Sequence, residues 1–459
     1  MITKKTKIVC TIGPATESKE KLAALLSAGM NVMRLNFSHG DFKEHRARVD
    51  NLKKAMLETG KTAAILQDLG GPKIRIGMFK TESVMLKEGA TFTLTTDKID
   101  GDEKHVSVNY PLLPKEVKKG HIIFLHDGKK KLEVIDVKGN DVITKILVGG
   151  EIKGKRGLNL PDSNLSISSL TEKDLADLEF GIKNKVDFIA LSFVRRPSDI
   201  TELKDILTAR KSNAKIIAKI ETPQSLECID EILELTDGIM VARGDLAIEI
   251  PAEKVPPVTK MLIEKCNYMG KPVITATQMM ESMIKSPVPT RAEVSDVANA
   301  IYDGTDAVML SEETTLGEYP VHAVDMMARI AETVESDDRY HANRNGSIHT
   351  GTEFDLIAES AVACAEGSDA ELIIAMMDSY EEAQAIASVK PHCPVLVATS
   401  NPTIFNQVNL SYGLYPFLIK KTEGLKEAKA FAIKNKLVSK GDMIIALSDK
   451  ECSIAIQTA

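Results

Sequence analysis

The feature that most constrains the fold of this chain is a short apolar run that recurs eight times, several times with polar or charged residues at or near its end. Between most of these runs the apolar residues have helical spacing, as at Leu22, Leu25 and Leu26. Strands that alternate with helices favour a parallel sheet. Eight such units favour a closed (β/α)8 TIM barrel over the alternative, an open doubly wound sheet. The runs lie at residues 7–13, 30–37, 63–69, 188–194, 215–221, 238–245, 271–277 and 307–311.

This alternation is interrupted once, at Gly70, Gly71 and Pro72. The segments that follow are short, alternate apolar with polar residues and are separated by Gly, Asp and Asn turns, which is typical of β structure. Beyond residue 335 a polar stretch leads into a smaller series of helices and strands. The sequence predicts an α/β chain with a barrel at residues 1–69 and 162–335, an inserted small β-barrel domain or lid at 70–161, and a C-terminal α/β domain for regulation or oligomerisation at 336–459.

Composition and charge exclude several classes of function. A net charge of −7 argues against a nucleic-acid backbone as the partner, and 4% aromatic residues argue against a platform for stacking bases. No apolar run is long enough for a membrane span or a signal peptide, so no membrane partner is expected. The six cysteines are scattered without CxxC spacing, which favours free thiols in a reducing cytoplasm.

Charged residues follow two successive runs of the barrel pattern. KIIAKIE ends at Lys219 and Glu221, and DGIMVARGD ends at Arg243 and Asp245. The carboxyl ends of neighbouring parallel strands meet where such barrels bind ligands. Two carboxylates that leave coordination positions open suit Mg²⁺, and a lysine and an arginine beside them suit an anionic substrate. The alternative is a salt-bridge cluster at the surface.

Seven motifs in order along the chain resemble those of the pyruvate kinase family: MNVMRLNFSHG, GPKIR, KIET, DGIMVARGDL, ITATQMMESM, PTRAEVSDVANAIYDGTDAVML and GEYP. The resemblance covers essentially the whole chain, strongly in the barrel and weakly after residue 340. It implies transfer of the phosphoryl group of phosphoenolpyruvate to ADP, giving pyruvate and ATP, with Mg²⁺ or in its place Mn²⁺. It also implies a cytoplasmic homotetramer that acts in glycolysis.

The resemblance assigns the chemistry to the barrel strand ends. Glu221 and Asp245 match the metal ligands. Lys219 matches the lysine that neutralises charge on the phosphoryl group and the developing enolate. Arg34 matches an arginine that reaches the phosphates; a salt-bridged barrel arginine is the alternative. Thr277 matches the threonine beside the substrate methylene group, which could take part in proton delivery or hold only a structural hydroxyl.

Binding contacts are also implied by the resemblance. N–H groups of the turn before Asp245 would receive the substrate carboxylate, and Gly244 would allow its close approach. Arg156 stands where the family usually has lysine. The contact to a nucleotide phosphate would then come from a planar guanidinium group with two donors and not from a single ammonium charge. His39 could instead only cap a loop. The substrate turn is Ala242, Arg243, Gly244 and Asp245, and the nucleotide positions are Thr11, Pro14, Asn36, His39, Arg75 and Arg156.

The chain departs from the family at the monovalent-cation region, which matches Asn36, Ser38 and Asp68. The usual threonine ligand of potassium is replaced by Leu69, and Lys73 stands where the family often has glutamate. We expect the Lys73 ammonium group to take the electrostatic role of potassium, as in a potassium-independent branch of the family. The alternative is that Lys73 points to solvent at the hinge.

The C-terminal domain departs most. Family members activated by sugar phosphates carry a Thr/Ser-Gly-rich phosphate loop where this chain has residues 377–383, MDSYEEA. Two carboxylates and no glycine make a poor phosphate cradle. The final SDKECSIAIQTA also lacks the family's Gly-Thr-Asn ending. We therefore expect no activation by fructose-1,6-bisphosphate, while the identity of any other allosteric effector stays open.

Two other functions compete with this interpretation. One is a magnesium-dependent enolate lyase or aldolase of TIM-barrel type, which would lack the inserted domain and its nucleotide contacts. The other is a catalytically silent scaffold, given the eroded C-terminal domain. Against the scaffold, all the residues matched to catalysis are intact, including Lys219, Glu221 and Asp245.

Overall fold

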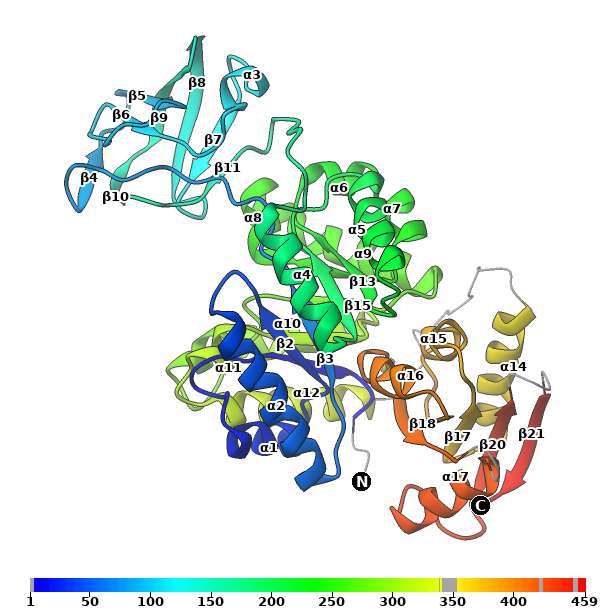
Figure 1. Cartoon of the computed structure of the whole chain (residues 1–459). Helices are drawn as coiled ribbons and strands as arrows, with labels where there is room; N and C mark the ends of the chain where they lie inside the picture. The colour runs from blue at the N-terminus through cyan, green and yellow to red at the C-terminus, as the bar shows by residue number, and fades with distance from the viewer. Residues whose placement is uncertain (1–3, 338, 341–352, 421–423, 449–452) are drawn as a thin grey trace.

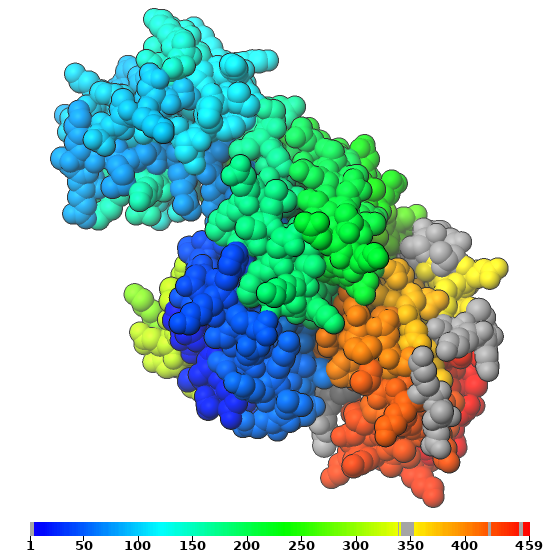
Figure 2. Space-filling model, in the orientation of Figure 1, coloured from blue at the N-terminus to red at the C-terminus, as the bar shows by residue number. Residues whose placement is uncertain are grey.

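The chain is described by a computed structural model that places residues 4–337, 339–340, 353–420, 424–448 and 453–459. Its three parts lie in a row: a β-rich lid, a helix-covered barrel and a smaller α/β domain (Figure 1). Figure 2 shows the lid projecting from the barrel on the side away from the C-terminal domain. Most of the polar stretch predicted as a linker and part of the C-terminal SDKECSIAIQTA lie outside the described residues.

Eight parallel strands close into the predicted barrel. Their order is β1-β16-β15-β14-β13-β12-β3-β2, so the last strand pairs with the first. All their side chains but those of Asn36 and Lys215 are buried. The strands are β1 (Lys7–Thr11), β2 (Val32–Asn36), β3 (Ala64–Asp68), β12 (Phe188–Leu191), β13 (Lys215–Ile220), β14 (Gly238–Ala242), β15 (Val273–Ala276) and β16 (Ala307–Leu310).

Side chains of the barrel strands alternate between the interior and the surrounding helices. In β1, Val9 belongs to the interior cluster, whereas Ile8 and Cys10 pack with the helices. Because both faces are covered, the strands read as nearly continuous apolar runs. The interior cluster continues into the C-terminal domain, where Tyr380 meets Phe188 edge-on with ring centroids 6.2 Å apart. The C-terminal domain therefore closes the amino end of the barrel.

Capping residues start the barrel helices. Ser18 and Asp41 each accept a hydrogen bond from a backbone N–H in the first turn of α1 and α2, and Thr171 with Asp174 forms a capping box at α4. The helices are α1 (Lys19–Ala28), α2 (Phe42–Thr59), α4 (Glu172–Asn184), α5 (Pro197–Ala209), α6 (Pro223–Glu227), α7 (Ile229–Leu235), α8 (Arg243–Glu249), η1 (Ala252–Lys254), α9 (Val255–Tyr268), η2 (Glu281–Ile284), α10 (Arg291–Tyr302), α11 (Glu312–Thr315) and α12 (Pro320–Glu335).

The inserted lid has its own apolar core but differs from the predicted small β-barrel. Its strands form a six-stranded sheet and a separate two-stranded sheet, because β4 and β10 pair only with each other. At the entry hinge, the Gly71 N–H donates to Asp174 of the α4 capping box at 3.1 Å. The elements are β4 (Ser83–Leu86), β5 (Thr91–Thr95), β6 (His105–Ser107), α3 (Leu113–Glu116), β7 (Ile122–Leu125), β8 (Lys130–Lys138), β9 (Asp141–Val148), β10 (Gly150–Lys153) and β11 (Leu158–Asn159).

The C-terminal domain is an α/β domain, as predicted, built on a five-stranded sheet of order β19-β18-β17-β20-β21. The sequence interpretation named the three central strands and missed β19 and the antiparallel edge strand β21. The elements are α14 (Glu353–Gly367), β17 (Leu372–Met376), α15 (Tyr380–Ser388), β18 (Val395–Thr399), α16 (Pro402–Gln407), η3 (Val408–Leu410), β19 (Leu414–Leu418), α17 (Gly424–Lys434), β20 (Met443–Ser448) and β21 (Ser453–Thr458).

Two expectations about the whole chain can be compared with the described residues. None of their helices is long and apolar enough to cross a membrane. Five of the six cysteines are free thiols, and Cys452 lies outside the described residues; the free ones are Cys10, Cys228, Cys266, Cys364 and Cys393.

Candidate active site

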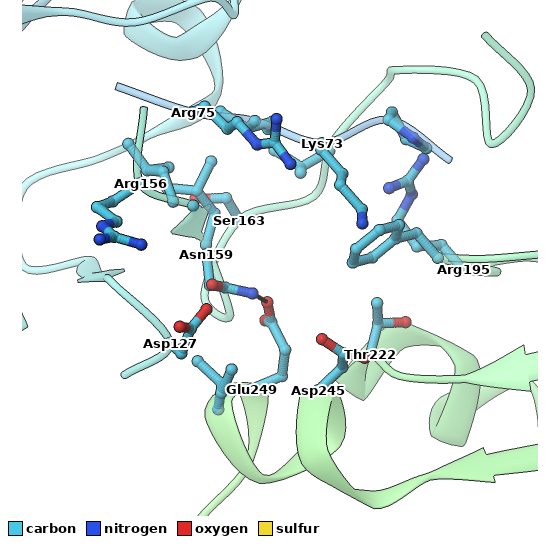
Figure 3. Close-up of a pocket in the computed structure, with 18 of the residues that line it drawn as sticks. Lys73, Arg75, Asp127, Arg156, Asn159, Ser163, Arg195, Thr222, Asp245 and Glu249 are labelled. Atoms are coloured by element: carbon cyan, nitrogen blue, oxygen red, sulfur yellow. Dashed lines mark hydrogen bonds between the residues drawn. The ribbon is translucent and has the colours of Figure 1, made fainter. Parts of the chain in front are cut away.

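A cavity of about 270 Å³ lies between the lid and the carboxyl end of the barrel. Figure 3 shows Lys73, Arg75 and Arg156 on the lid side and Asp245 and Glu249 on the barrel side. Positive side chains thus face carboxylates across the cavity. A polyanionic substrate and a cation could be bound together in such a space.

Beneath the cavity, three charged side chains from β2, β3 and β13 and a fourth directly after β13 form one network. Arg34 Nε and Nη2 both lie 2.7 Å from Asp68 Oδ2, and its Nη1 donates to Thr11 Oγ1 at 2.7 Å. Lys219 Nζ lies 3.3 Å from Asp68 Oδ1 and 2.8 Å from Glu221 Oε1. All four charged side chains are at least nine-tenths buried. Burying charges costs free energy of folding unless the charges are paired. The network is therefore a buried, organised site and not a salt-bridge cluster at the surface.

The network shifts the pKa values of its members. Burial tends to lower the pKa of Lys219, but the neighbouring carboxylates Asp68 and Glu221 outweigh it and raise that pKa. Burial tends to raise the pKa of Asp68, but Arg34 and Lys219 outweigh it and lower that pKa. Lys219 is therefore a fixed positive charge at neutral pH. By contrast, burial raises the pKa of Glu221, and the nearby Asp245 carboxylate adds to this effect.

Glu221 and Asp245 have the properties of ligands for a divalent cation. Glu221 Oε2 accepts the Phe193 N–H at 2.8 Å, while its buried Oε1 has the Lys219 ion pair but no hydrogen bond. The Asp245 carboxylate makes no hydrogen bond or ion pair with any described residue. Among the described residues there is no group of three or more His, Cys, Asp or Glu side chains placed to hold a metal. A site with two carboxylates and positions left for substrate and water suits Mg²⁺.

The turn that opens α8 is held by β15 and α10. The Gly244 N–H donates to Thr277 Oγ1 at 2.7 Å, and that hydroxyl donates to the Ala276 carbonyl at 2.7 Å. Arg243 forms a two-pronged ion pair with Asp296, with N–O distances of 2.7 and 2.6 Å. The Arg243 guanidinium group is thus engaged by the protein in this structure. Its guanidinium group therefore serves to anchor α8.

Thr277 has an unusual backbone conformation. Its φ is +70°, a region that β-branched residues rarely adopt, and Gln278 follows with φ +55°. Strain of this kind is often found at functional sites. The conformation brings the Thr277 hydroxyl group to the N-terminus of α8, which also carries Asp245.

Lys73 enters the predicted monovalent-cation region. Its Nζ donates to Ser38 Oγ at 2.8 Å, and Asn36 Oδ1 accepts the Ser38 N–H at 3.0 Å. Burial and the positive charge of Lys219 lower the pKa of Lys73, whereas Asp245 and Asp68 oppose the decrease. The ammonium group therefore interacts electrostatically with charged residues of the site, although Lys73 as a whole is exposed.

The predicted nucleotide positions do not all lie together. Arg75 and Arg156 line the cavity, and Thr11 belongs to the buried network below it. Pro14 and His39 are exposed and are not among the cavity-lining residues. The structure thus groups the two lid arginines with the metal site but leaves these two loop residues outside.

Three residues that the sequence interpretation did not name contribute to the site. Ser192 accepts from Lys219 Nζ at 2.7 Å and donates to the Leu69 carbonyl at 2.7 Å. Its position directly after β12 was a usable signal, because the other site residues also follow strands. Asp296 and Glu249 lie within helices, and no local pattern marks them.

A lidded (β/α)8 barrel with a carboxylate pair, a buried lysine and lid arginines is typical of an enzyme that acts on anionic substrates. Two family models match: "Pyruvate kinase, barrel domain" over residues 3–324 and "Pyruvate kinase, alpha/beta domain" over residues 355–458. The chain belongs to the pyruvate kinase family and is a phosphotransferase.

Individual relatives agree with the family models. A pyruvate kinase of Geobacillus stearothermophilus is 46% identical over 451 residues, which are 96% of this chain and 77% of that protein. One from Staphylococcus aureus (strain MRSA252) is 44% identical with the same coverage. A crystal structure of a pyruvate kinase from Cryptosporidium parvum superposes with a TM-score of 0.95 at 36% identity, covering 99% of this chain and 96% of that one.

These comparisons decide between the functions that the sequence left open. The kinase interpretation is confirmed, and the lyase and scaffold alternatives find no support among the relatives reported. The family is generally Mg²⁺-dependent and acts on phosphoenolpyruvate and ADP.

Proposed function

We propose that the network around Lys219 transfers the phosphoryl group of phosphoenolpyruvate to ADP. The observation that carries this assignment is the position of Lys219, buried among Ser192, Asp68 and Glu221 at the mouth of the barrel. A fixed positive charge there can neutralise a phosphoryl group in transfer and the enolate left behind.

The residues of the network and of the cavity have different roles in this reaction. Glu221 and Asp245 would hold a divalent cation, Mg²⁺ or Mn²⁺, which would supply Lewis-acid polarisation of the substrate oxygens. The bond from phosphorus to the enol oxygen breaks, and a terminal oxygen of ADP forms the new one. Arg34 orients the phosphoryl group, and the lid arginines Arg75 and Arg156 hold the ADP phosphates.

The enolate then takes a proton at its methylene carbon. Thr277 is placed for this step only if its hydroxyl group releases the Ala276 carbonyl, to which it donates in this structure. The hydrogen bond that it accepts from Gly244 gives it a second role, which is to position α8 and with it Asp245.

The first experiment is ADP-dependent pyruvate formation from phosphoenolpyruvate, with Mg²⁺, with Mn²⁺ and with excess chelator. We expect turnover with either metal and none with chelator. Pyruvate formation without ADP, or no turnover under any condition, would contradict the proposal.

We further propose that turnover needs no potassium, because the Lys73 ammonium group occupies the cation region beside Ser38. Wild type should turn over equally in potassium and in a tetramethylammonium buffer. Lys73→Met should lose activity about tenfold or more in the latter and regain part of it with potassium. Lys87→Met, which removes an exposed lid lysine, is the matched control. If the wild-type enzyme were active only with potassium, this role of Lys73 would be contradicted.

We also propose that fructose-1,6-bisphosphate does not activate the enzyme. In the loop at residues 377–383, Asp378 Oδ1 accepts from Thr399 Oγ1 at 2.7 Å and from the Ser400 N–H at 3.0 Å. These are donors that a phosphate would otherwise use, and the carboxylate would repel it. A clear drop in the apparent KM for phosphoenolpyruvate over a dose series of this sugar phosphate would contradict the proposal.

We also propose that the chain forms a homotetramer in the cytoplasm. The proposed lid domain spans residues 70–161, and the proposed C-terminal domain spans residues 336–459. Light scattering coupled to size exclusion should give four times the chain mass of 50.1 kDa. Limited proteolysis should cut first near the proposed domain borders.

A further inference from the structure

The short helix α8 carries both a candidate metal ligand and a contact to the lid. Asp245 and Glu249 are four residues apart, so they lie on the same face of the helix, and both line the cavity. Any tilt of α8 that moves Glu249 therefore moves Asp245. The two ends of this helix are held by different parts of the molecule.

The end of α8 near Glu249 is held by the lid. Asn159 Nδ2, on lid strand β11, donates to Glu249 Oε1 at 2.8 Å across the cavity (Figure 3). Next to Glu249, Ile248 faces the turn between β7 and β8, where a Cβ added to Gly128 would lie 3.6 Å from it. His126 and Asp127 in this turn both have positive φ, 54° and 55°, so the turn is strained where it approaches α8.

The other end of α8 is held by the barrel. The Gly244 N–H donates to Thr277 Oγ1, and Arg243 is paired with Asp296. Between these ends, Leu246 is fully buried and packs α8 onto the barrel. The hydrogen bond from the lid adds a contact at the far end of a helix whose near end carries the candidate metal ligand.

The chemistry of Glu249 suits a neutral donor. Burial raises the pKa of Glu249 to about 7, helped by Asp245 and Glu221 and opposed by the bond from Asn159. An amide N–H donates to a carboxyl oxygen whether or not the group carries a proton. The contact therefore needs no particular charge on Glu249, and a cation in place of Asn159 is not required.

We propose that Glu249 is a positioning residue for phosphoryl transfer: its hydrogen bond from Asn159 couples closure of the lid to the placement of Asp245. This inference rests on the proposed function. When the bond forms, the lid covers the substrates and α8 presents its carboxylate at the same time. When it is absent, the lid opens more easily and water gains access to the phosphoryl group.

The test is a double-mutant cycle on Glu249→Ala and Asn159→Ala, with pyruvate and ATP measured in parallel. Each single variant should lower kcat/KM for ADP about three- to tenfold, the value of one hydrogen bond, and should form more pyruvate than ATP. The double variant should be no worse than either single one. Glu249→Gln, which keeps the accepting oxygen, should recover most of the loss, and Glu253→Ala, at an exposed acid just beyond α8, is the control.

The outcomes separate the two proposals. If wild type makes no ATP, the proposed function fails whatever the variants do. If wild type is active but the losses of the single variants add up in the double variant, the coupling is refuted. Equal losses in Glu249→Gln and Glu249→Ala would also refute it, because the acceptor would then be irrelevant. If Glu249→Ala fails to fold, Asn159→Ala, which changes only the lid, still tests the proposal: unchanged kcat/KM for ADP in that variant would refute it.

Discussion

At the scale of single residues, the site depends on charges that the protein pairs incompletely. Lys219 is fully engaged by Ser192, Asp68 and Glu221, whereas Asp245 has no partner among the described residues. A half-buried carboxylate without a partner, beside a buried one whose pKa is raised, is explained by a ligand that neutralises both.

This explanation predicts the behaviour of Glu221→Gln. The amide keeps the shape and can still accept from Phe193, so the fold should remain, while kcat should fall at least about a hundredfold because a neutral ligand holds a divalent cation poorly. Steady-state kinetics and titration with Mn²⁺ followed by electron paramagnetic resonance would measure both effects. Glu231→Gln, at an exposed acid on α7, should change neither. Unchanged Mn²⁺ affinity in Glu221→Gln would contradict the metal assignment.

At the scale of elements, the lid hinge and the active site share contacts. Gly71 has φ +64° and donates its N–H to Asp174, which forms the α4 capping box with Thr171. A Cβ on Gly71 would lie 2.9 Å from Phe193 Cδ2 and 3.0 Å from Ser192 Cβ. Ser192 accepts the bond from Lys219, so a displacement at the hinge reaches the network directly.

A pair of glycine substitutions separates strain from this contact. Gly139, in the β8–β9 turn, has φ +61° and nothing within 4 Å of an added Cβ. Gly139→Ala should cost about 1 kcal/mol of stability and leave activity unchanged. Gly71→Ala bears the same backbone cost plus the clash, and its activity should fall tenfold or more. Denaturant unfolding and kinetics measure the two effects; equal activity in both variants would show that the hinge contact is unimportant for catalysis.

At the scale of the whole molecule, the two ends of the barrel have different tasks. The carboxyl end holds the cavity, while aspartates precede three strands at the amino end: Asp187, Asp237 and Asp306 each accept an N–H of the neighbouring strand. Asp306 also pairs with Lys390 of the C-terminal domain at 2.9 Å. This end therefore serves stability and the joining of domains, as is usual for such barrels.

Asp187 makes stability depend on pH. Burial raises its pKa from 3.8 to about 7, although the Ile65 N–H bond opposes this. Folded Asp187 thus binds a proton more tightly than unfolded Asp187, and its contribution is fully present below pH 3.8 and lost as pH rises through about 7. The difference is on the order of 4 kcal/mol.

Asp187→Asn removes this titration. Its melting temperature relative to wild type should therefore rise from pH 5 to pH 8, because wild type must bury a charge at the higher pH. Asp205→Asn, at an exposed position on α5, should show no such trend. Scanning calorimetry at both pH values is the measurement, and a difference independent of pH would contradict the assignment.

Much of the fold could be predicted because the signal is local. Each barrel strand is an apolar run, and β13 ends at Ile220, between Lys219 and Glu221, as expected. The strand expected to end at Arg243 and Asp245 stops at Ala242, and both of these residues lie in α8. The predictions failed where the local signal is ambiguous. β19 contains Pro416 and half-buried aromatic residues, and the alternation of the lid strands does not distinguish one closed barrel from two sheets.

The sequence by itself determined the fold class, the family and the residues at the strand ends, because periodicity and motifs depend on near neighbours in the chain. Only the tertiary structure decided how these residues pair. Arg243 is bound to Asp296, Thr277 holds α8, and the lid reaches Glu249 from 90 positions away in the chain. A hydrophobic pattern tells which face of an element is buried, but it carries no information on which distant polar group will satisfy a buried donor.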